Sequence, residues 1–287
     1  MDRRAFITAA GGVVAAGLAP LARVSAASHE LREPRRRDVI GLQLYTVRRE
    51  MAQDVERTLQ RVAEMGYREV EFAGYFDHSP AEVRAMLARH GLRSPASHVP
   101  YERIERDWAA ALDEAAAVGH EWVVVPWLDA KRLTTVDDWR RVAERLGAAG
   151  VAARAAGLRL GYHNHDFEFR PVEGAEGRVP LDLLLADTDP ESVDFELDLY
   201  WMVRAGHDPL AWYARHPGRF RLAHVKDSAG APEHRMVDVG RGTIDFVRIL
   251  PAAARAGTTH FFVEHDDPAD PLASARASIA YLARLDF

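Results

Sequence analysis

Residues 158–169 read Leu-Arg-Leu-Gly-Tyr-His-Asn-His-Asp-Phe-Glu-Phe, and they concentrate polar side chains where a buried strand is expected to end. The first half is mostly apolar, whereas the second half places His163, His165 and Glu168 beside an asparagine and an aspartate. A buried polar group without a partner costs about 1–3 kcal/mol, so these groups must satisfy one another, a metal or a ligand. The segment therefore predicts one wall of a binding site.

Three later segments supply matching side chains. Asp198, His224 and Glu264 each lie near the end of a separate predicted strand. Together with Glu168 they make a set of three carboxylates and one imidazole, which suits a divalent ion such as Mn²⁺, Mg²⁺, Co²⁺ or Zn²⁺. The chain contains no cysteine, so any metal must be held by His, Asp and Glu.

The elements that must position these residues alternate between short β-rich runs and longer amphipathic stretches. The eight predicted strands are 39–45, 69–73, 95–99, 122–127, 158–163, 193–199, 220–226 and 260–265. The predicted helices are 55–65, 80–90, 108–118, 136–156, 181–186, 210–215, 244–256 and 272–285, and Pro251 is expected to kink or split the seventh.

Local signals mark the ends of these helices. Ser79-Pro80 and Asp208-Pro209 each place an N-cap residue before a proline at the first helical position. A glycine follows five helical runs, where it can adopt the left-handed conformation that ends a helix. These glycines are Gly66, Gly91, Gly119, Gly157 and Gly257.

Eight βα units in about 250 residues predict a single-domain (β/α)₈ TIM barrel of the α/β class. The rival is an open doubly wound sheet, but no Gly-x-Gly-x-x-Gly motif follows any predicted strand. Barrel enzymes carry their chemistry at the carboxyl ends of the strands, and the unusual polar residues fall there.

The first residues predict an export signal. Arg3-Arg4 precedes a mostly apolar run rich in Ala and Gly, and Val24-Ser25-Ala26 offers small residues for cleavage. The run is too short and too rich in small residues to anchor the chain in a membrane. We therefore expect residues 1–26 to be a twin-arginine signal, 27–38 a linker and 39–287 the barrel of an exported, periplasmic protein.

The charge balance limits the partners. The chain has 37 basic and 43 acidic residues and a net charge of −6, which gives no electrostatic reason to bind nucleic acid or an anionic membrane surface. We expect a small-molecule partner and no stable membrane insertion, and a homo-oligomer is compatible with the sequence.

The chain resembles the xylose-isomerase-like TIM barrels known as sugar phosphate isomerases/epimerases, and more narrowly a secreted subgroup with a twin-arginine signal. The resemblance covers about residues 39–287. It rests on the segments 41–45, 66–71, 162–169, 197–201, 224–227, 240–242 and 264–266.

This resemblance implies that Glu168, Asp198, His224 and Glu264 hold a divalent metal. In many relatives the glutamate of the fifth strand lies on the strand itself, whereas here that place holds His163 and the glutamate comes five residues later. Either Glu168 reaches back to the ion, or His163 or His165 replaces it.

The implied activity is that of a metal-dependent sugar isomerase or epimerase that works through an enediolate. In similar epimerases two glutamates act on opposite faces of the substrate, which makes Glu168 and Glu264 the predicted acid/base pair. His163, His165 and Lys226 are expected to donate hydrogen bonds to developing negative charge.

Two other functions compete. A lyase or hydratase acting on keto-sugars or 3-keto-glycosides would use the same metal-stabilised enolate to expel a leaving group. The other is a non-catalytic sugar-binding barrel.

Other strand-end residues are candidates for substrate contact. Glu71 and His98 are expected to meet sugar hydroxyls, and Trp127 or Trp201 the apolar face of a sugar ring. Each of the four is also explained by hydrogen bonding or packing within the protein.

Overall fold

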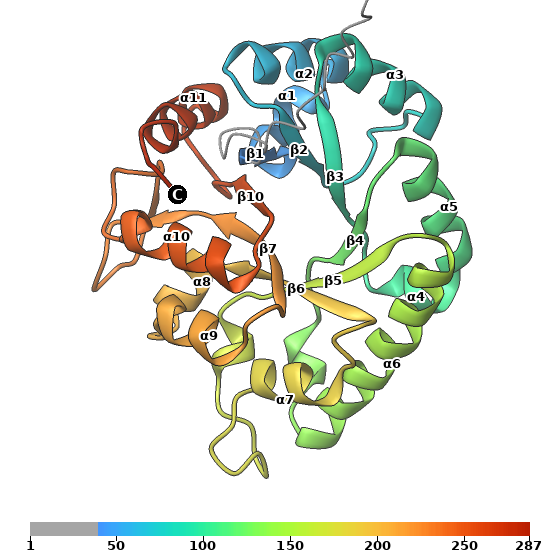
Figure 1. Cartoon of the computed structure of the whole chain (residues 1–287), viewed down its shortest axis with the longest axis vertical. Helices are drawn as coiled ribbons and strands as arrows, with labels where there is room; N and C mark the ends of the chain where they lie inside the picture. The colour runs from blue at the N-terminus through green and yellow to red at the C-terminus, as the bar shows by residue number, and fades with distance from the viewer. Residues whose placement is uncertain (1–39) are drawn as a thin grey trace, which may run out of the picture. The chain divides into compact units, whose positions relative to one another are not determined.

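The structure is a computed structural model that describes residues 40–287. Eight parallel strands close into a barrel in the order β1-β10-β7-β6-β5-β4-β3-β2, and helices surround it on the outside (Figure 1). The predicted single-domain (β/α)₈ barrel is confirmed. The predicted export signal and linker lie outside the described residues.

The barrel strands are short, and the helices vary in length. The strands are β1 (Ile40–Gln43), β2 (Glu69–Phe72), β3 (Arg93–His98), β4 (Trp122–Val125), β5 (Arg159–His163), β6 (Val193–Asp198), β7 (Phe220–Val225) and β10 (His260–Val263), and β8 (Asp227–Ser228) pairs with β9 (Met236–Val237) in a separate two-stranded sheet. The helices are α1 (Arg48–Met51), α2 (Val55–Glu64), α3 (Pro80–His90), α4 (Glu102–Arg106), α5 (Trp108–Val118), α6 (Val136–Ala155), α7 (Pro180–Asp187), α8 (Leu199–Arg204), α9 (Pro209–Arg215), α10 (Phe246–Ala256) and α11 (Pro271–Leu282). Short 3₁₀ helices are η2 (Leu44–Val47), η3 (Ala130–Arg132) and η4 (Phe167–Phe169).

The predicted helix caps form. Ser79 and Glu82 make a reciprocal capping box at the start of α3, and the Asp208 carboxylate accepts a hydrogen bond from the backbone N–H of Leu210. All five glycines predicted to end helices have positive φ angles. Local sequence signals therefore mark the ends of several helices.

Seven of the eight predicted strands end one or two residues earlier than expected, and side-chain capping explains this for β1 and β6. The Gln43 side chain accepts a hydrogen bond from the backbone N–H of Tyr45, so the chain turns into η2 directly after β1. The Asp198 carboxylate caps α8 by accepting a hydrogen bond from the backbone N–H of Trp201. The sequence did not predict the hairpin β8–β9 or the short helices α4 and α8, and α10 runs through Pro251 without splitting.

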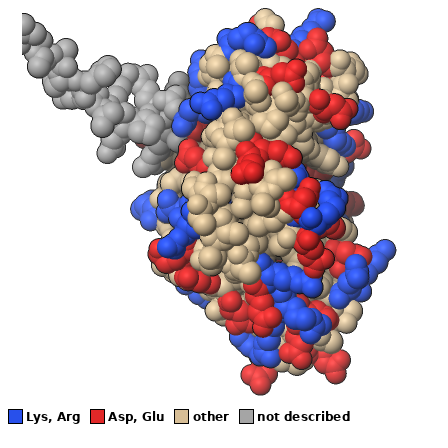
Figure 2. Space-filling view, turned by 90° about the vertical axis from the view of Figure 1, so that its right-hand side faces the viewer, with Lys and Arg blue, Asp and Glu red and all other residues tan. Residues whose placement is uncertain are grey.

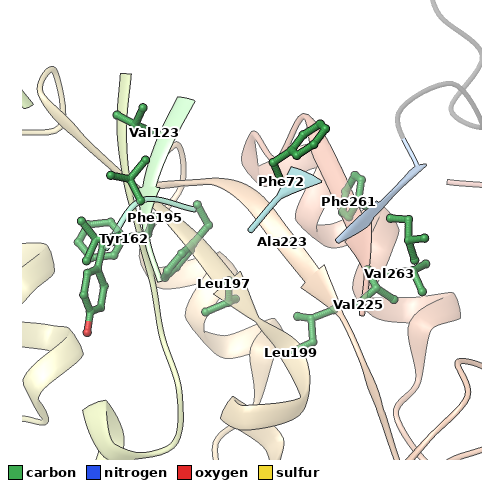
Figure 3. Close-up of a cluster of buried hydrophobic side chains, with 14 of the residues drawn as sticks. Phe72, Val123, Tyr162, Phe195, Leu197, Leu199, Ala223, Val225, Phe261 and Val263 are labelled. Atoms are coloured by element: carbon green, nitrogen blue, oxygen red, sulfur yellow. The ribbon is translucent and has the colours of Figure 1, made fainter. Parts of the chain in front are cut away.

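Successive side chains of each strand point alternately outward and into the barrel, so they form two sets. One set faces the helices and forms the large core between barrel and helices, part of which is drawn in Figure 3. The other set points into the barrel, where a small apolar cluster forms a plug. The plug consists of Ala96, Trp122, Val124, Leu222 and Phe262.

The plug decides where the polar residues gather. His98, His224 and Glu264 each follow a plug residue by two positions, so they share its inward direction and lie one step nearer the carboxyl ends of the strands. The same alternation carries Glu196 and Asp198 of β6 inward. The barrel interior thus changes from apolar to ionisable at the end where catalysis takes place in this fold.

The outer surface mixes charges with uncharged areas. Figure 2 shows an area without Lys, Arg, Asp or Glu on the flank that faces right in Figure 1, with charges of both signs around it. Helices α5 and α6 lie on this side in Figure 1, and both carry exposed alanines, among them Ala109, Ala116 and Ala152. Within residues 40–287 no helix is long and apolar enough to cross a membrane.

Helix α6 offers a matched test of packing. A Cβ added at Gly150 would lie 2.2 Å from the backbone oxygen of Ser192, whereas one added at Gly147 meets nothing within 4 Å. We expect Gly150→Ala to lower the free energy of unfolding by about 1–3 kcal/mol, because a backbone group cannot move aside cheaply. Gly147→Ala is expected to be neutral or stabilising by up to about 1 kcal/mol. Urea unfolding of both variants measures the difference, and equal effects would contradict the packing described.

Candidate metal and active site

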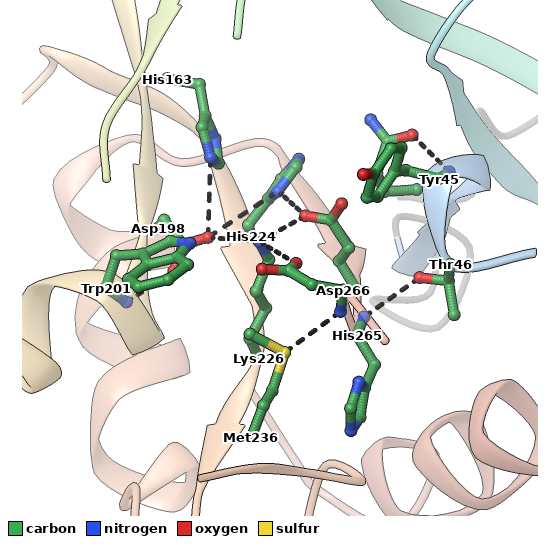
Figure 4. A network of polar contacts seen from close by, with 12 residues as sticks. Tyr45, Thr46, His163, Asp198, Trp201, His224, Lys226, Met236, His265 and Asp266 are labelled. Atoms are coloured by element: carbon green, nitrogen blue, oxygen red, sulfur yellow. Dashed lines mark hydrogen bonds and ion pairs between the residues drawn. The ribbon is translucent and has the colours of Figure 1, made fainter. Parts of the chain in front are cut away.

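Asp198, His224 and Glu264 come together at the carboxyl ends of β6, β7 and β10. One ligand atom from each lies within 4.8 Å of the others, and all three side chains are buried. His224 Nδ1 lies 2.7 Å from Glu264 Oε2 and 4.0 Å from Asp198 Oδ2. The structure therefore brings together three of the four residues assigned to the metal by resemblance, and Figure 4 labels two of them, Asp198 and His224.

Glu168, the fourth, lies elsewhere. It is fully buried in η4, where Oε1 accepts a hydrogen bond from the Tyr162 hydroxyl at 2.5 Å and Oε2 one from the backbone N–H of His165 at 2.9 Å. The 3₁₀ turn directs the side chain beside β5 rather than toward β6 and β7. The structure does not bring Glu168 into the metal group, and both of its oxygens hold the local loop in place.

His163 occupies the place that Glu168 does not. Its Nε2 lies 3.7 Å from Asp198 Oδ2, and its Nδ1 lies 3.1 Å from Glu196 Oε2. Of the alternatives open from the sequence, His163 is therefore the fifth-strand residue nearest to the ligand group. His165 faces the cavity instead, and its buried Nδ1 has no hydrogen-bond partner.

Glu196 organises a second set of imidazoles beneath the first group. His98 Nε2, His163 Nδ1 and His224 Nε2 lie 3.0, 3.1 and 3.1 Å from its Oε2. These four residues also satisfy the spacing of a metal site. Glu196 was not singled out from the sequence, although its position two residues before Asp198 on one strand was the signal that both point inward.

Glu71 supports His224 from the second strand. Its Oε2 lies 2.6 Å from His224 Nε2 and accepts a hydrogen bond from Gln43 Nε2 at 2.7 Å. Glu71 is fully buried and does not line the cavity, so the structure places it against His224 rather than at the cavity surface. A carboxylate on one imidazole nitrogen fixes the tautomer and leaves the other nitrogen for a metal.

The Lys226 ammonium contacts two of the candidate metal ligands. Its ammonium nitrogen lies 3.1 Å from Asp198 Oδ2, 2.7 Å from Glu264 Oε2 and 2.8 Å from Asp266 Oδ1. A cation is thus already stabilised between two of the candidate ligands. Asp266 belongs to the segment 264–266 that supports the family resemblance, but no role was assigned to it from the sequence. In the structure its carboxylate contacts the Lys226 ammonium.

Burial and charge shift the titration of these groups in opposite directions. Although burial alone would raise the pKa of Glu264, the nearby Lys226 and His224 hold it well below its usual range. Burial raises the pKa of Asp198 to about 6, against the opposing effect of Lys226. Burial opposes protonation of Lys226, but Asp198, Glu264 and Asp266 hold its pKa well above the usual range. Glu264 is therefore a carboxylate and Lys226 an ammonium at neutral pH.

The pKa values of two histidines are also shifted in opposite directions. Burial would lower the pKa of His224, yet the carboxylates of Glu196, Glu264 and Glu71 hold it well above its usual range. Burial, followed by repulsion from Lys226, lowers the pKa of His165 to about 3. His165 is therefore neutral and can take part in hydrogen bonds with a ligand.

The site opens into a cavity of about 430 Å³. Five of the predicted substrate contacts line it, whereas Glu71 and Trp201 do not; the centre of the Trp201 ring lies 5.4 Å from that of His165. Glu264 is the member of the metal group that reaches the cavity. The lining residues are Tyr45, Ala73, Gly74, His98, Pro100, Pro126, Trp127, His163, His165, Lys226, Glu264 and Asp266.

The donor set fits a divalent ion. Asp198 Oδ2 is buried without a hydrogen bond, and its close neighbour is the cationic Lys226. Four fully or almost fully buried carboxylates, those of Glu71, Glu196, Asp198 and Glu264, concentrate negative charge around His224. Carboxylate and imidazole ligands in a buried negative environment are what Mn²⁺, Co²⁺ or Zn²⁺ requires.

The fold and site define the class of protein. The chain belongs to the family of xylose isomerase-like TIM barrels, whose family model matches residues 59–285. It is an enzyme family in which a divalent metal at this end of the barrel is consistent with the His, Asp and Glu cluster described above.

Among individual proteins, the chain is 25% identical over 252 residues to an inosose dehydratase of Lacticaseibacillus casei, covering 75% of this chain and 83% of the relative. It is 30% identical to a sugar phosphate isomerase/epimerase from Parabacteroides distasonis, whose crystal structure superposes with a TM-score of 0.75 over 85% of this chain and 92% of that one. The IOLI protein, solved with a bound zinc atom, shares the fold at 13% identity, with a TM-score of 0.67 over 85% of this chain and 96% of that chain.

Measurements of metal affinity should distinguish the proposed metal ligands from Glu168. We expect Asp198→Asn to weaken binding of Mn²⁺ by more than about tenfold, because it removes an anionic ligand. His163→Ala should weaken binding in the same direction. Glu168→Gln is the matched control and should bind the ion normally. Titration calorimetry on protein stripped with EDTA measures these affinities, and circular dichroism checks folding. Loss of binding in Glu168→Gln with normal binding in Asp198→Asn would contradict the assignment.

Glu168 also predicts a pH dependence of stability. Burial raises the pKa of its carboxyl from 4.5 to about 8, despite hydrogen bonds from Tyr162 and from the backbone of His165. The unfolded chain therefore loses this proton first, and the stabilisation present at low pH is lost as the pH rises through about 8.

We expect the metal-free wild type to lose stability relative to Glu168→Gln between pH 5 and pH 8, by an amount of the order of a few kcal/mol. Urea unfolding of both proteins at the two pH values measures the difference. A stability gap that does not change with pH would show that Glu168 does not titrate in this way.

Proposed function

We propose that this protein is a divalent-metal-dependent lyase that eliminates water or an alcohol from a cyclic keto-sugar. The observation that carries the proposal is the position of Glu168. Because the Glu168 carboxylate is bound by the Tyr162 hydroxyl and the His165 backbone and does not line the cavity, the cavity lacks the pair of glutamates on opposite faces that an epimerase of the expected type would use.

What lines the cavity instead is a proton acceptor beside a proton donor. Glu264 is anionic, Lys226 is cationic, and their polar atoms lie 2.7 Å apart on the same wall. A bound divalent ion would supply a Lewis acid for the carbonyl oxygen of the substrate. A carboxylate has two oxygens, so Glu264 can hold the ion and still face the substrate.

In the proposed reaction Glu264 takes the proton from the carbon next to the substrate carbonyl. The C–O bond at the β-carbon breaks as the carbon–carbon double bond forms, and Lys226 gives a proton to the departing oxygen. The contact between Glu264 and Lys226 then returns the first proton to the lysine, so that only water or an alcohol is released. His165, whose buried Nδ1 has no partner in the protein, can orient a substrate hydroxyl.

The likeness to inosose dehydratases supports elimination. A second candidate is the isomerase or epimerase activity expected from the sequence, which the likeness to a sugar phosphate isomerase/epimerase supports. Both functions share the first proton transfer and differ in the second step, which is either loss of the leaving group or return of a proton to carbon.

The fate of the substrate distinguishes the two functions. We expect the metal-loaded protein in D₂O to release water or the alcohol from cyclic keto-polyols or 3-keto-glycosides, monitored by mass spectrometry and by absorbance of the unsaturated ketone. Deuterium incorporation into a ketose without elimination would favour the isomerase or epimerase instead.

Glu264→Gln should keep the fold and reduce turnover by at least about a hundredfold, because the proton acceptor is lost. Glu121→Gln, an exposed carboxylate at the other end of the barrel, is the matched control and should retain full activity. Full activity in Glu264→Gln would exclude both functions.

A further inference from the structure

The cavity above the site has two chemically different halves. The residues that end β5, β7 and β10 supply its ionisable wall, which includes His163, His165, Lys226 and Glu264. The residues that end or follow β1 to β4 supply the other wall. Apart from His98, that wall consists of Tyr45, Ala73, Gly74, Pro100, Pro126 and Trp127.

The second wall exposes two aromatic rings. Within residues 40–287, four large hydrophobic side chains are strongly exposed, and two of them line this one cavity. Tyr45 is 42% exposed and Trp127 is 49% exposed. The other two, Val151 and Val247, lie on α6 and α10 and do not line the cavity. Exposed aromatic side chains in a concave site are typical of ligand contact.

The Tyr45 ring is held in place before any ligand arrives. The Arg48 guanidinium lies 4.0 Å from the centre of the ring. The same guanidinium donates hydrogen bonds to the backbone oxygens of Tyr45 at 2.8 Å and Asp266 at 2.7 Å. The ring is thereby tied to the strand end that carries Glu264, so little entropy is lost when a ligand packs on it.

The size of the cavity indicates a ligand with more than one part. A volume of about 430 Å³ lies within the range that accepts drug-sized molecules. The ionisable half is suited to a ring rich in hydroxyl groups. The apolar half has two polar side-chain groups, the Tyr45 hydroxyl and the His98 imidazole, and His98 Nε2 already contacts Glu196. A charged or strongly hydrated group would find few polar partners there.

We propose that Tyr45 and Trp127 form a subsite for a planar, uncharged aglycone, so that the substrate is an aryl keto-glycoside rather than a free keto-sugar. This proposal rests on the proposed elimination, in which the aglycone alcohol is the leaving group. In this proposal the sugar ring lies against Glu264 and Lys226. The aglycone packs against the rings of Tyr45 and Trp127 and the nearby Pro100 and Pro126.

The kinetic test compares a phenyl 3-keto-glucoside with its methyl analogue. Stacking on an aromatic side chain is expected to give the phenyl compound a KM about five- to tenfold lower than that of the methyl compound. Trp127→Ala should remove this preference, and Trp127→Phe should retain most of it. Val247→Ala, an exposed residue outside the cavity, is the matched control and should leave both KM values unchanged. An equal change in both KM values in Trp127→Ala, or no preference in the wild type, would overturn the subsite.

A binding test separates failure of the subsite from failure of the proposed reaction. Phenyl and methyl β-glucosides lack the ketone and cannot be eliminated, so calorimetry measures the subsite alone. Tighter binding of the phenyl compound that depends on Trp127 supports the subsite even if no elimination occurs. Elimination from keto-sugars without any phenyl preference in binding or KM would leave the reaction standing and exclude the subsite.

Discussion

The structure depends on the neutralisation of buried negative charge at one end of the barrel. Glu71, Glu196, Asp198 and Glu264 are almost completely removed from water, and isolated carboxylates in such a place would be strongly destabilised. His224 is stabilised as a cation because it contacts three of them. The remaining excess of negative charge explains both why Lys226 is drawn into the group and why a divalent ion suits it.

The loop that follows β7 is held in place by hydrogen bonds to Asp227. The carboxylate of Asp227, next to Lys226, accepts hydrogen bonds from the backbone N–H groups of Ser228, Gly240, Gly242 and Ile244. A Cβ at position 242 would lie 2.2 Å from that carboxylate, so the glycine allows the close approach of the loop. The loop after β7 is thereby fixed directly behind the lysine that faces the cavity.

The two halves of the cavity follow from the order of the strands. Consecutive strands of a βα barrel are neighbours, so β1 to β4 form one side and β5, β6, β7 and β10 the other. Among the residues that line the cavity, most of the ionisable ones come from the second half of the chain, and the small or aromatic ones come from the first. One wall is therefore suited to proton transfer and the other to recognition, which links the proposed reaction to the proposed aglycone subsite.

The sequence by itself determined the barrel, because alternating apolar runs, proline and aspartate caps and terminal glycines act locally or with a fixed period. It also determined that Asp198, His224 and Glu264 share one mouth, since parallel strands end at the same side. The tertiary structure decided the rest. Glu168 and His163 lie five residues apart, and only the 3₁₀ turn of η4 shows that the first contacts Tyr162 and the second Asp198. The contacts of Glu196 and Glu71 with His224 arise from packing across the barrel, so only the structure shows them. Contacts of that kind join residues far apart in the chain, and no local pattern specifies them.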